Sequence, residues 1–350
     1  MITRRDFSRS AAAAGAALLG SRVMASPLGS STTTSFSGDT AQKSTASSVR
    51  GFVGTPVTPF KADESIDGDT YQKIVDFLVR KGAQVLASPM HVGEALSMSS
   101  EERRQLAKLA VEAVNGRIPV FIHCSLPGTR ETVALAQQAQ SVGAQGIVVV
   151  TPYFYHLGNA PLLDHFVTVA KSIDISVIVY HNQSVGELPL EVLSELIQRS
   201  PNVIGLKDGS HEMGFFTEAC RLTSALRPGF AVFDGVENAA NTVPVGGVGC
   251  FSPISELAPT LVRSLIDACV AKDHEKALPL QWKVTELEGI LAKYGGFAGL
   301  ASHKPARAIM GRPCGIPRKP LPALDKETVS KLEAALTRSG VLADESTGWA

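Results

Sequence analysis

The stretch that decides the fold is NVIGLKD at residues 202–208, an apolar run that ends in a lysine and an aspartate. Similar β-rich runs recur after residue 50, and amphipathic segments of about 12–18 residues separate them. The eight runs are 51–60, 83–89, 118–124, 145–153, 175–181, 202–208, 230–235 and 247–253. This alternation predicts an α/β fold, a (β/α)8 TIM barrel. A doubly wound sheet is the alternative, but no GxGxxG follows the first run.

The chain beyond residue 257 is predicted to contain helices only. After the helix that follows the eighth strand, helical patterns cover the segments near 274–294, 304–310 and 325–339. We therefore expect one domain at 50–345, a barrel that carries a C-terminal helical extension over about 273–342.

The first 49 residues differ from the rest. TRRDFSRS at 3–10 precedes the apolar run AAAAGAALLG at 11–20, and a small-residue site follows near Ala25. This order predicts a signal peptide at 1–25, and the Arg4–Arg5 pair resembles a twin-arginine signal. A chance arginine pair is the alternative. Residues 26–49 are predicted to be a disordered linker. The expected location is periplasmic or secreted, with no membrane attachment after cleavage.

The composition excludes some classes of protein. The formal net charge is zero and the sequence has no dense Lys/Arg run, so nucleic acid is not an expected partner. The five cysteines form no CxxC pair, and we expect them to be buried as small apolar residues.

In a (β/α)8 barrel the chemistry lies where strands end and loops begin. The residues at these positions are Thr58, His91, His123, Tyr153, His181, Lys207, Glu237 and Ser252. A desolvated lysine loses its charge more readily, and its neutral amine attacks a ketone to form a Schiff base. Gly205, on the same strand face, is expected to leave room for the Lys207 stem. Tyr153 is a candidate proton relay. Alternatively, Lys207 forms an ion pair with Asp208 or another carboxylate at this end of the barrel, and Tyr153 is a partly buried aromatic residue whose hydroxyl lies in water.

Several motifs together resemble one family. They are GTPVTPF (54–60), GE (93–94), TPYFY (151–155), IGLKDG (204–209), GGVGCFSPISELAP (246–259) and the C-terminal segment 318–340. Over about 51–342 the chain resembles the dihydrodipicolinate synthase / N-acetylneuraminate lyase family. The resemblance implies a (β/α)8 class I lyase or aldolase that acts on 2-oxo acids without metal or organic cofactor. It also implies a homo-oligomer, a dimer or tetramer. By position, Lys207 matches the Schiff-base lysine and Tyr153 the tyrosine that moves protons.

The loop after the second strand departs from the family pattern. Where the family has a glycine and two hydroxyl residues before Gly-Glu, this chain reads MHVGE at 90–94. We expect the amides of 91–93 to hold the substrate carboxylate. His91 either pairs with that carboxylate as an imidazolium or bonds a neighbouring loop. The substrate-binding residues implied are Thr55, His91, Val92, Gly93, Gly235, Glu237, Phe251 and Ser252.

Further departures concern the substrate. The loop 123–132 lacks a tyrosine that the resemblance predicts there, and 180–189 replaces the usual Tyr-Asn-x-Pro. The missing tyrosine, together with the missing hydroxyl residues at 91–92, argues against synthesis of dihydrodipicolinate, and the change at 180–189 implies a different pocket wall. DGVEN at 234–238 resembles the lyase branch, in which Glu237 and Asn238 would hold sugar hydroxyls; alternatively, Asn238 caps the next helix.

The predicted function is a Schiff-base lyase or aldolase for a 2-oxo acid, either a keto-deoxy sugar acid or an aldol adduct of pyruvate. Three alternatives stay open: an exported, non-catalytic binding protein for a small carboxylate, dihydrodipicolinate synthase proper, and a metal-dependent hydrolase. The last would use His91, His123 and His181, whose spacing matches no metal motif. No metal site is predicted.

Overall fold

The computed structural model describes residues 49–182, 185–296 and 299–350. The predicted signal peptide at 1–25 and all but the last residue of the linker at 26–49 lie outside the described residues. Within the described residues, no helix is both long and apolar enough to cross a membrane.

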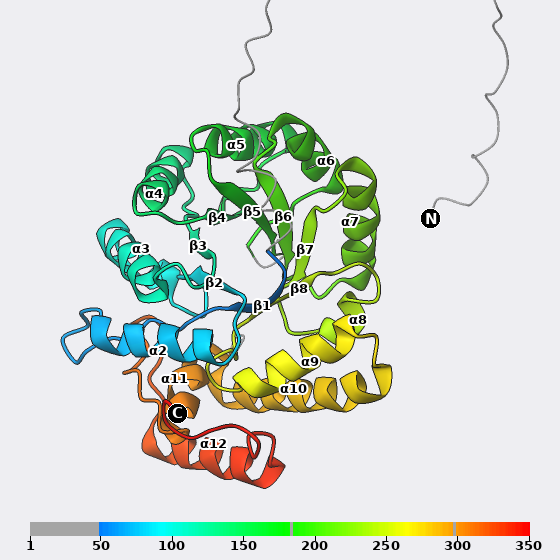
Figure 1. The fold of residues 1–350 in the computed structure, drawn as a ribbon. Helices are drawn as coiled ribbons and strands as arrows, with labels where there is room; N and C mark the ends of the chain where they lie inside the picture. Colours follow the sequence, from blue (N-terminus) through cyan, green and yellow to red (C-terminus); the bar gives the residue numbers. More distant parts are fainter. Residues whose placement is uncertain (1–48, 183–184, 297–298) are drawn as a thin grey trace, which may run out of the picture. The chain divides into compact units, whose positions relative to one another are not determined.

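Eight parallel strands close into a barrel in chain order, and β8 pairs back with β1 (Figure 1). The strands are β1 (Gly51–Gly54), β2 (Val85–Ser88), β3 (Val120–His123), β4 (Gly146–Val150), β5 (Ser176–His181), β6 (Val203–Asp208), β7 (Ala231–Asp234) and β8 (Gly249–Ser252). The prediction of a (β/α)8 barrel with C-terminal helices is confirmed, because its eight runs contain the eight strands in order.

Helices surround the barrel on its outside (Figure 1). Those between strands are α2 (Gly68–Arg80), α3 (Ser100–Val114), α4 (Thr129–Ser141), α5 (Asn159–Lys171), α6 (Leu190–Arg199), α7 (Met213–Leu226) and the short α8 (Ala239–Thr242), with a 3-10 turn, η1, at Ala95–Ser97. After β8 come α9 (Pro259–Val270), α10 (His274–Gly295), α11 (Leu300–Ile309) and α12 (Lys326–Ser339). Ser99 and Glu102 form a capping box at the start of α3, which fixes where that helix begins.

Glycine allows the barrel to close. Gly249 at the start of β8 has a φ of 151°, and a Cβ there would lie 2.1 Å from the carbonyl oxygen of Gly51 in β1. No other residue fits this approach without moving one strand. The strands that meet here are almost entirely buried apolar residues, as expected for a parallel sheet covered by helices.

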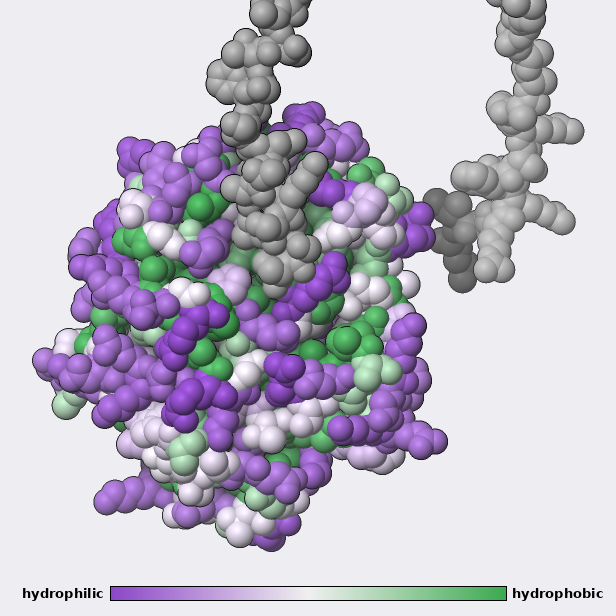
Figure 2. All heavy atoms as spheres, in the orientation of Figure 1, coloured by the Kyte–Doolittle hydropathy of each residue, from purple (hydrophilic) through white to green (hydrophobic). Residues whose placement is uncertain are grey.

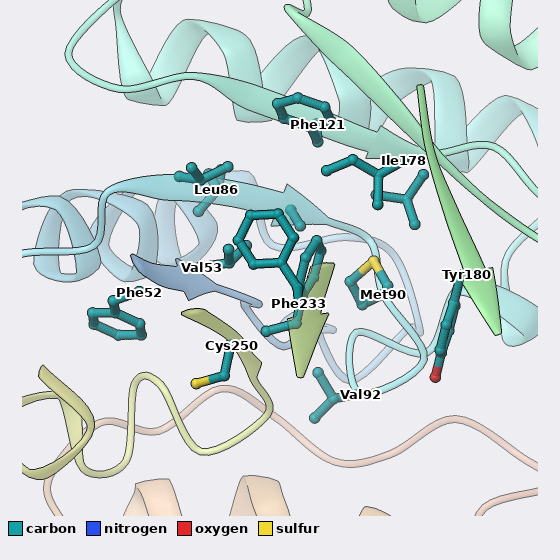
Figure 3. Close-up of a cluster of buried hydrophobic side chains, with 14 of the residues drawn as sticks. Phe52, Val53, Leu86, Met90, Val92, Phe121, Ile178, Tyr180, Phe233 and Cys250 are labelled. Carbon is teal, nitrogen blue, oxygen red and sulfur yellow. The ribbon is translucent and has the colours of Figure 1, made fainter. Parts of the chain in front are cut away.

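One continuous core of buried apolar side chains fills the barrel and the layer between strands and helices. Figure 3 shows part of it, with Phe52, Phe121 and Phe233 on three different strands and with Tyr180 on β5. The outer face in Figure 2 is mostly hydrophilic, with smaller hydrophobic patches between the charged residues.

Two buried ion pairs fasten the C-terminal helices to loops at the carboxyl ends of the strands. Lys304 on α11 lies 2.6 Å from Glu94 in the loop after β2, and Arg307 lies 3.0 Å from Glu256 after β8. Glu256 also accepts the N–H of Val57, at 2.6 Å. The extension therefore fixes the loops after β1, β2 and β8.

Candidate active site

A cavity of about 620 Å³ opens at the carboxyl ends of the strands. Part of its wall comes from the ends of strands and the loops after them: Thr55, Met90, His91, Val92, Tyr180, Asn182, Lys207, Gly209, Gly235 and Phe251. The C-terminal helices also contribute, among others through Thr285, Glu288 and Gly289 on α10 and Leu300 and His303 on α11. This is the end of a (β/α)8 barrel where active sites lie.

Lys207 lies in this cavity without a counter-ion. The residue is 6% exposed, and its Nζ lies 3.8 Å from the ring centroid of Tyr180 and 5.3 Å from that of Phe251. It forms no ion pair with any residue that the structure describes. Asp208 instead accepts the N–H of Ser210 at 3.0 Å, and burial raises the pKa of its carboxyl. The alternative in which Lys207 pairs with Asp208 is therefore wrong.

Gly235 provides the space for the lysine stem. A Cβ at Gly235 would lie 2.7 Å from Cε of Lys207 and 2.8 Å from the Asp208 carbonyl oxygen. A Cβ at Gly205 would instead meet Ala231, with its carbonyl oxygen at 2.7 Å. The expectation that Gly205 makes this room is wrong, because that glycine faces the neighbouring strand β7.

The tyrosine beside Lys207 is Tyr180. It is the register partner of Lys207 across β5 and β6, so the two side chains leave the sheet together. Asn182 donates a hydrogen bond to the Tyr180 hydroxyl oxygen at 2.9 Å. Sequence reasoning missed Tyr180, although it lies at the end of an apolar run in the same way as Lys207.

Tyr153 does not line the cavity, and burial raises the pKa of its phenol. It follows β4 by three residues and is half-buried. The structure thus places a different phenol next to the lysine from the one that the sequence predicts.

The loop after β2 presents unused hydrogen-bond donors. Within the described residues, the backbone N–H groups of 91–93 have no acceptor. The Gly93 carbonyl accepts the Thr58 hydroxyl at 2.6 Å, and a Cβ at Gly93 would lie 2.8 Å from the Pro56 carbonyl oxygen. His91 and Val92 line the cavity, whereas Gly93 lies behind it and holds the turn.

His91 is a neutral imidazole near pH 7. Burial, and then the charges of Lys207 and Arg103, lower its pKa to about 3. Its Nε2 is buried without a hydrogen-bond partner in the described chain, and its ring packs against those of His123 and Tyr180 at centroid distances of 5.3 and 5.5 Å. Nε2 of His91 therefore bonds no neighbouring loop among the described residues, and the residue itself lines the cavity.

The other two histidines support loops. Nδ1 of His123 lies 3.3 Å from Arg103, and Nδ1 of His181 accepts the N–H of Leu188 at 3.0 Å. Neither lines the cavity. Among the residues at 49–182, 185–296 and 299–350, no group of three or more His, Cys, Asp or Glu side chains is placed to hold a metal ion.

Four of the remaining predicted residues divide between the cavity and the layer behind it. Thr55 and Phe251 line it, and the Thr55 hydroxyl donates to the Ser252 carbonyl at 2.5 Å. Ser252 and Glu237 are fully buried, and the Ser252 hydroxyl donates to Glu237 Oε1 at 2.6 Å. Sequence reasoning missed Glu288, because nothing in the α10 pattern indicates that this position faces the site.

A buried lysine in a cavity at the mouth of a (β/α)8 barrel, with a phenol against it, is the arrangement that a class I, imine-forming enzyme requires. The sequence model of the dihydrodipicolinate synthetase family matches residues 48–339, and the chain belongs to this family. It is accordingly a lyase of that family.

Individual relatives agree with this assignment. A 4-hydroxy-tetrahydrodipicolinate synthase of Bartonella quintana is 33% identical over 297 residues, which cover 84% of this chain and 99% of the relative. An uncharacterised DapA-like lyase of Halobacterium salinarum is also 33% identical, over 84% of this chain and 95% of its own.

Solved structures of the family have the same fold. YagE of Escherichia coli K12, crystallised in complex with pyruvate, has a TM-score of 0.80 at 26% identity, over 84% of this chain and 99% of its own. The dihydrodipicolinate synthase of Thermotoga maritima has a TM-score of 0.78 at 27% identity, with the same coverage of the two chains.

Proposed function

We propose that the protein is a class I lyase or aldolase that binds a 2-oxo acid covalently through an imine at Lys207. The observation that carries this proposal is the position of Nζ: buried, without a counter-ion, and in a cavity large enough for a small acid. Within the described residues, no carboxylate forms an ion pair with Nζ, so this nitrogen is open to a substrate in the cavity. The pyruvate complex of the relative YagE supports the same class of substrate.

The first step forms the imine. The Nζ electron pair attacks the carbonyl carbon, and the carbonyl oxygen takes up two protons in succession and leaves as water. One of these protons comes from the amine and the other from an external acid. We assign this role to Tyr180, which lines the cavity and whose ring centroid lies 3.8 Å from Nζ. The hydrogen bond from Asn182 stabilises the phenolate that remains.

The second step breaks a bond beta to the imine nitrogen. In a retro-aldol cleavage, the C3–C4 electron pair forms the C2=C3 double bond of the enamine, and the C=N electron pair returns to the iminium nitrogen, which becomes neutral. The C4 hydroxyl proton goes to the Tyr180 phenolate. Tyr180 then donates this proton to C3 of the enamine. Hydrolysis of the resulting iminium by water releases the 2-oxo acid, restores Lys207 and returns a proton to the phenolate. An aldol adduct of pyruvate and a keto-deoxy sugar acid can both react through these steps.

The loop after β2 is proposed to hold the substrate carboxylate. Its unused N–H groups at 91–93 act together with His91, a neutral hydrogen-bonding group in place of hydroxyl side chains. Thr55 and Phe251 complete the wall around the reacting carbon.

Borohydride reduction in the presence of pyruvate tests the proposal. We expect the mass of one reduced pyruvate adduct on the protein and its location on the peptide that contains Lys207. Lys304, which is also buried, is the internal control and should stay unmodified. Tight binding of 2-oxo acids without any adduct would instead indicate a non-catalytic binding protein.

The N-terminal motifs support a second, separate proposal, that the chain is exported through the twin-arginine route. The basic segment at 3–10 and the apolar run at 11–20 support it. Replacement of Arg4 and Arg5 by lysine should leave uncleaved protein in the cytoplasm, as fractionation and N-terminal sequencing would show. Export that continues unchanged in this variant contradicts the twin-arginine route.

A further inference from the structure

A series of three polar side chains, Arg103, His123 and His91, leads from α3 to the cavity. The Arg103 guanidinium is 2% exposed and donates to the carbonyls of Ser125 at 2.9 Å and His123 at 2.6 Å. One of its nitrogens also lies 3.3 Å from Nδ1 of His123. The His123 ring meets the His91 ring edge to face, at a centroid distance of 5.3 Å. Of these three residues, His91 alone lines the cavity.

Arg103 is a buried cation that the proposed chemical steps do not use. It forms no ion pair with any residue that the structure describes. Carbonyl oxygens accept from both of its terminal nitrogens, whereas Nε has no partner in the described chain. The carbonyls satisfy N–H groups but leave a full positive charge in a desolvated place behind His91. That charge stabilises an anion bound on the other side of the His91 ring.

The contact with Arg103 fixes where the His123 ring carries its proton. Burial lowers the pKa of His123 well below its usual value, so the ring is neutral and holds one N–H. Nδ1 faces the guanidinium, which only donates, so Nδ1 keeps its lone pair and the proton is on Nε2. The Pro89 carbonyl, an acceptor beside the ring, stabilises a ring N–H. His123 is therefore held in one tautomer.

The two nitrogens of His91 have different surroundings. Nε2 is buried and has no hydrogen-bond partner in the described chain. Nδ1 also has no partner among the described residues, but it is not buried, and the residue lines the cavity. A proton on Nε2 would be a buried donor without an acceptor, whereas a proton on Nδ1 faces a space that a ligand can fill. The charge of Arg103 likewise favours the lone pair on the buried nitrogen.

Lys207 carries the competing charge. After burial, the charges of Lys207 and then Arg103 lower the pKa of His91, and Lys207 lines the cavity whereas Arg103 does not. In the ligand-free protein the Lys207 ammonium therefore favours a lone pair on Nδ1. A carboxylate bound at the loop 91–93 offsets this charge from within the cavity. The proton then belongs on Nδ1 once an acid is bound.

We propose that Arg103 and His123 are positioning residues that orient His91 with its proton on Nδ1, so that His91 donates a hydrogen bond to the substrate carboxylate. The loop then recognises the acid with one neutral side-chain donor beside its backbone N–H groups, and the positive charge stays buried on Arg103. This inference rests on the proposed function, because the carboxylate at this loop is the one next to the imine at Lys207.

Nitrogen NMR tests the orientation directly. In protein with nitrogen-15-labelled histidine, long-range proton–nitrogen correlations distinguish a ring nitrogen that carries a proton from one that does not. The spectrum of His91→Asn identifies the His91 signals. The ligand is lactate, which has the carboxylate of pyruvate but no ketone and forms no imine. We expect the His91 signals to shift as lactate is added, with the proton on Nδ1 in the bound state. A proton on Nε2, or signals that do not shift, overturns the inference.

Variants of the two positioning residues test their effect on binding. His123→Phe keeps a ring against His91 and removes both ring nitrogens. The His91 proton should then distribute over both nitrogens, and the pyruvate concentration for half-maximal trapping at Lys207 should rise about tenfold, the effect of one weakened hydrogen bond to a charged group. The trapping rate at saturating pyruvate should stay close to that of the wild type. Arg103→Met should have at least the effect of His123→Phe, and Arg103→Lys, which keeps the charge, should recover most of the lost affinity.

His165→Phe is the matched control. His165 is 3% exposed, its Nδ1 lies 2.9 Å from the Thr129 hydroxyl, and its Nε2 has no partner in the described chain, yet it does not line the cavity. Its replacement should change neither the His91 spectrum nor the trapping by pyruvate. Thermal unfolding verifies that each variant folds, and His123→Phe alone decides if Arg103→Met does not.

The outcomes separate the two proposals. Half-maximal trapping at the wild-type pyruvate concentration in His123→Phe, or a His91 proton that stays on Nδ1 in this variant, overturns the inference and leaves the imine chemistry standing. Failure of pyruvate to form an adduct at Lys207 overturns the proposed function, and the spectra with lactate still decide the orientation of His91.

Discussion

Lys207 and Lys304 are both buried, and both lie over an aromatic ring, yet their surroundings differ. Nζ of Lys304 lies 4.2 Å from the Phe60 ring centroid, 2.6 Å from Glu94 and 3.0 Å from the Ile316 carbonyl. Nζ of Lys207 lies 3.8 Å from the Tyr180 ring and faces the cavity with no carboxylate partner in the described chain. Burial alone therefore does not mark a reactive lysine. The distinction lies in what neutralises the charge and what space is left beside it.

The comparison predicts opposite phenotypes for the same substitution. Lys207→Met should remove the pyruvate adduct and lower kcat by at least about a thousandfold, because no other residue supplies the nucleophile. The melting temperature should change little, since the methionine stays against Tyr180 and Phe251. Peptide mapping after borohydride reduction and a scan of thermal unfolding measure the two effects. Full activity in this variant would end the Schiff-base assignment.

Tyr180→Phe separates the ring of Tyr180 from its hydroxyl. The ring under Lys207 remains, so pyruvate should still be trapped at Lys207, but kcat should fall by about a hundredfold or more because the proton relay is lost. Tyr153→Phe is the matched control and should keep most of the activity, since Tyr153 does not line the cavity. If the two variants exchange these results, the relay belongs to Tyr153.

Lys304→Met should act on stability. It leaves Glu94 buried beside an apolar side chain, and breaking a buried ion pair in this way typically costs about 3–5 kcal/mol. Urea unfolding measures the loss. The double variant Lys304→Met/Glu94→Gln should recover part of it, because the uncompensated charge is gone. An adduct should still form at Lys207 in the folded fraction.

Gly235→Ala tests the space beside the reactive lysine. The new methyl group would lie 2.7 Å from Cε of Lys207 and 2.8 Å from a backbone oxygen, so the lysine stem must move. A displacement of about 1 Å at a reacting group can cost about a hundredfold in rate. When borohydride is added at set times after pyruvate, we expect the adduct at Lys207 to form more slowly than in the wild type. The melting temperature should stay close to that of the wild type. A trapping rate equal to that of the wild type contradicts the tight fit.

The sequence predicts the barrel well because strand and helix periodicity are local properties, and the eight runs need only be counted. It identifies Lys207 because a charge at the end of an apolar run is conspicuous. It misses Tyr180 because a tyrosine in a strand resembles any other core residue until the register with β6 is known. It misses Glu288 for a related reason, since only tertiary packing places that face of α10 over the cavity. Local pattern thus gives the elements, and contacts between distant elements complete the site.

The ion pairs that join the C-terminal segment to the loops near Lys304 also give the smallest predicted effect, which is a dependence of the unfolding free energy on pH. Arg318 donates its backbone N–H to Glu94 at 2.7 Å and its guanidinium to Glu102 at 2.6 Å. The hydrogen bond from Arg318 lowers the pKa of Glu102 to about 2 from an ordinary value of 4.5. The folded-state pKa is depressed, so the stabilisation is complete above pH 4.5 and is lost as the pH falls towards 2. The difference in unfolding free energy between wild type and Glu102→Gln should therefore shrink across that interval in urea titrations. Because both side chains are partly exposed, added salt should also reduce this difference in unfolding free energy. A difference that persists unchanged at low pH would show that the Arg318–Glu102 ion pair is not its source.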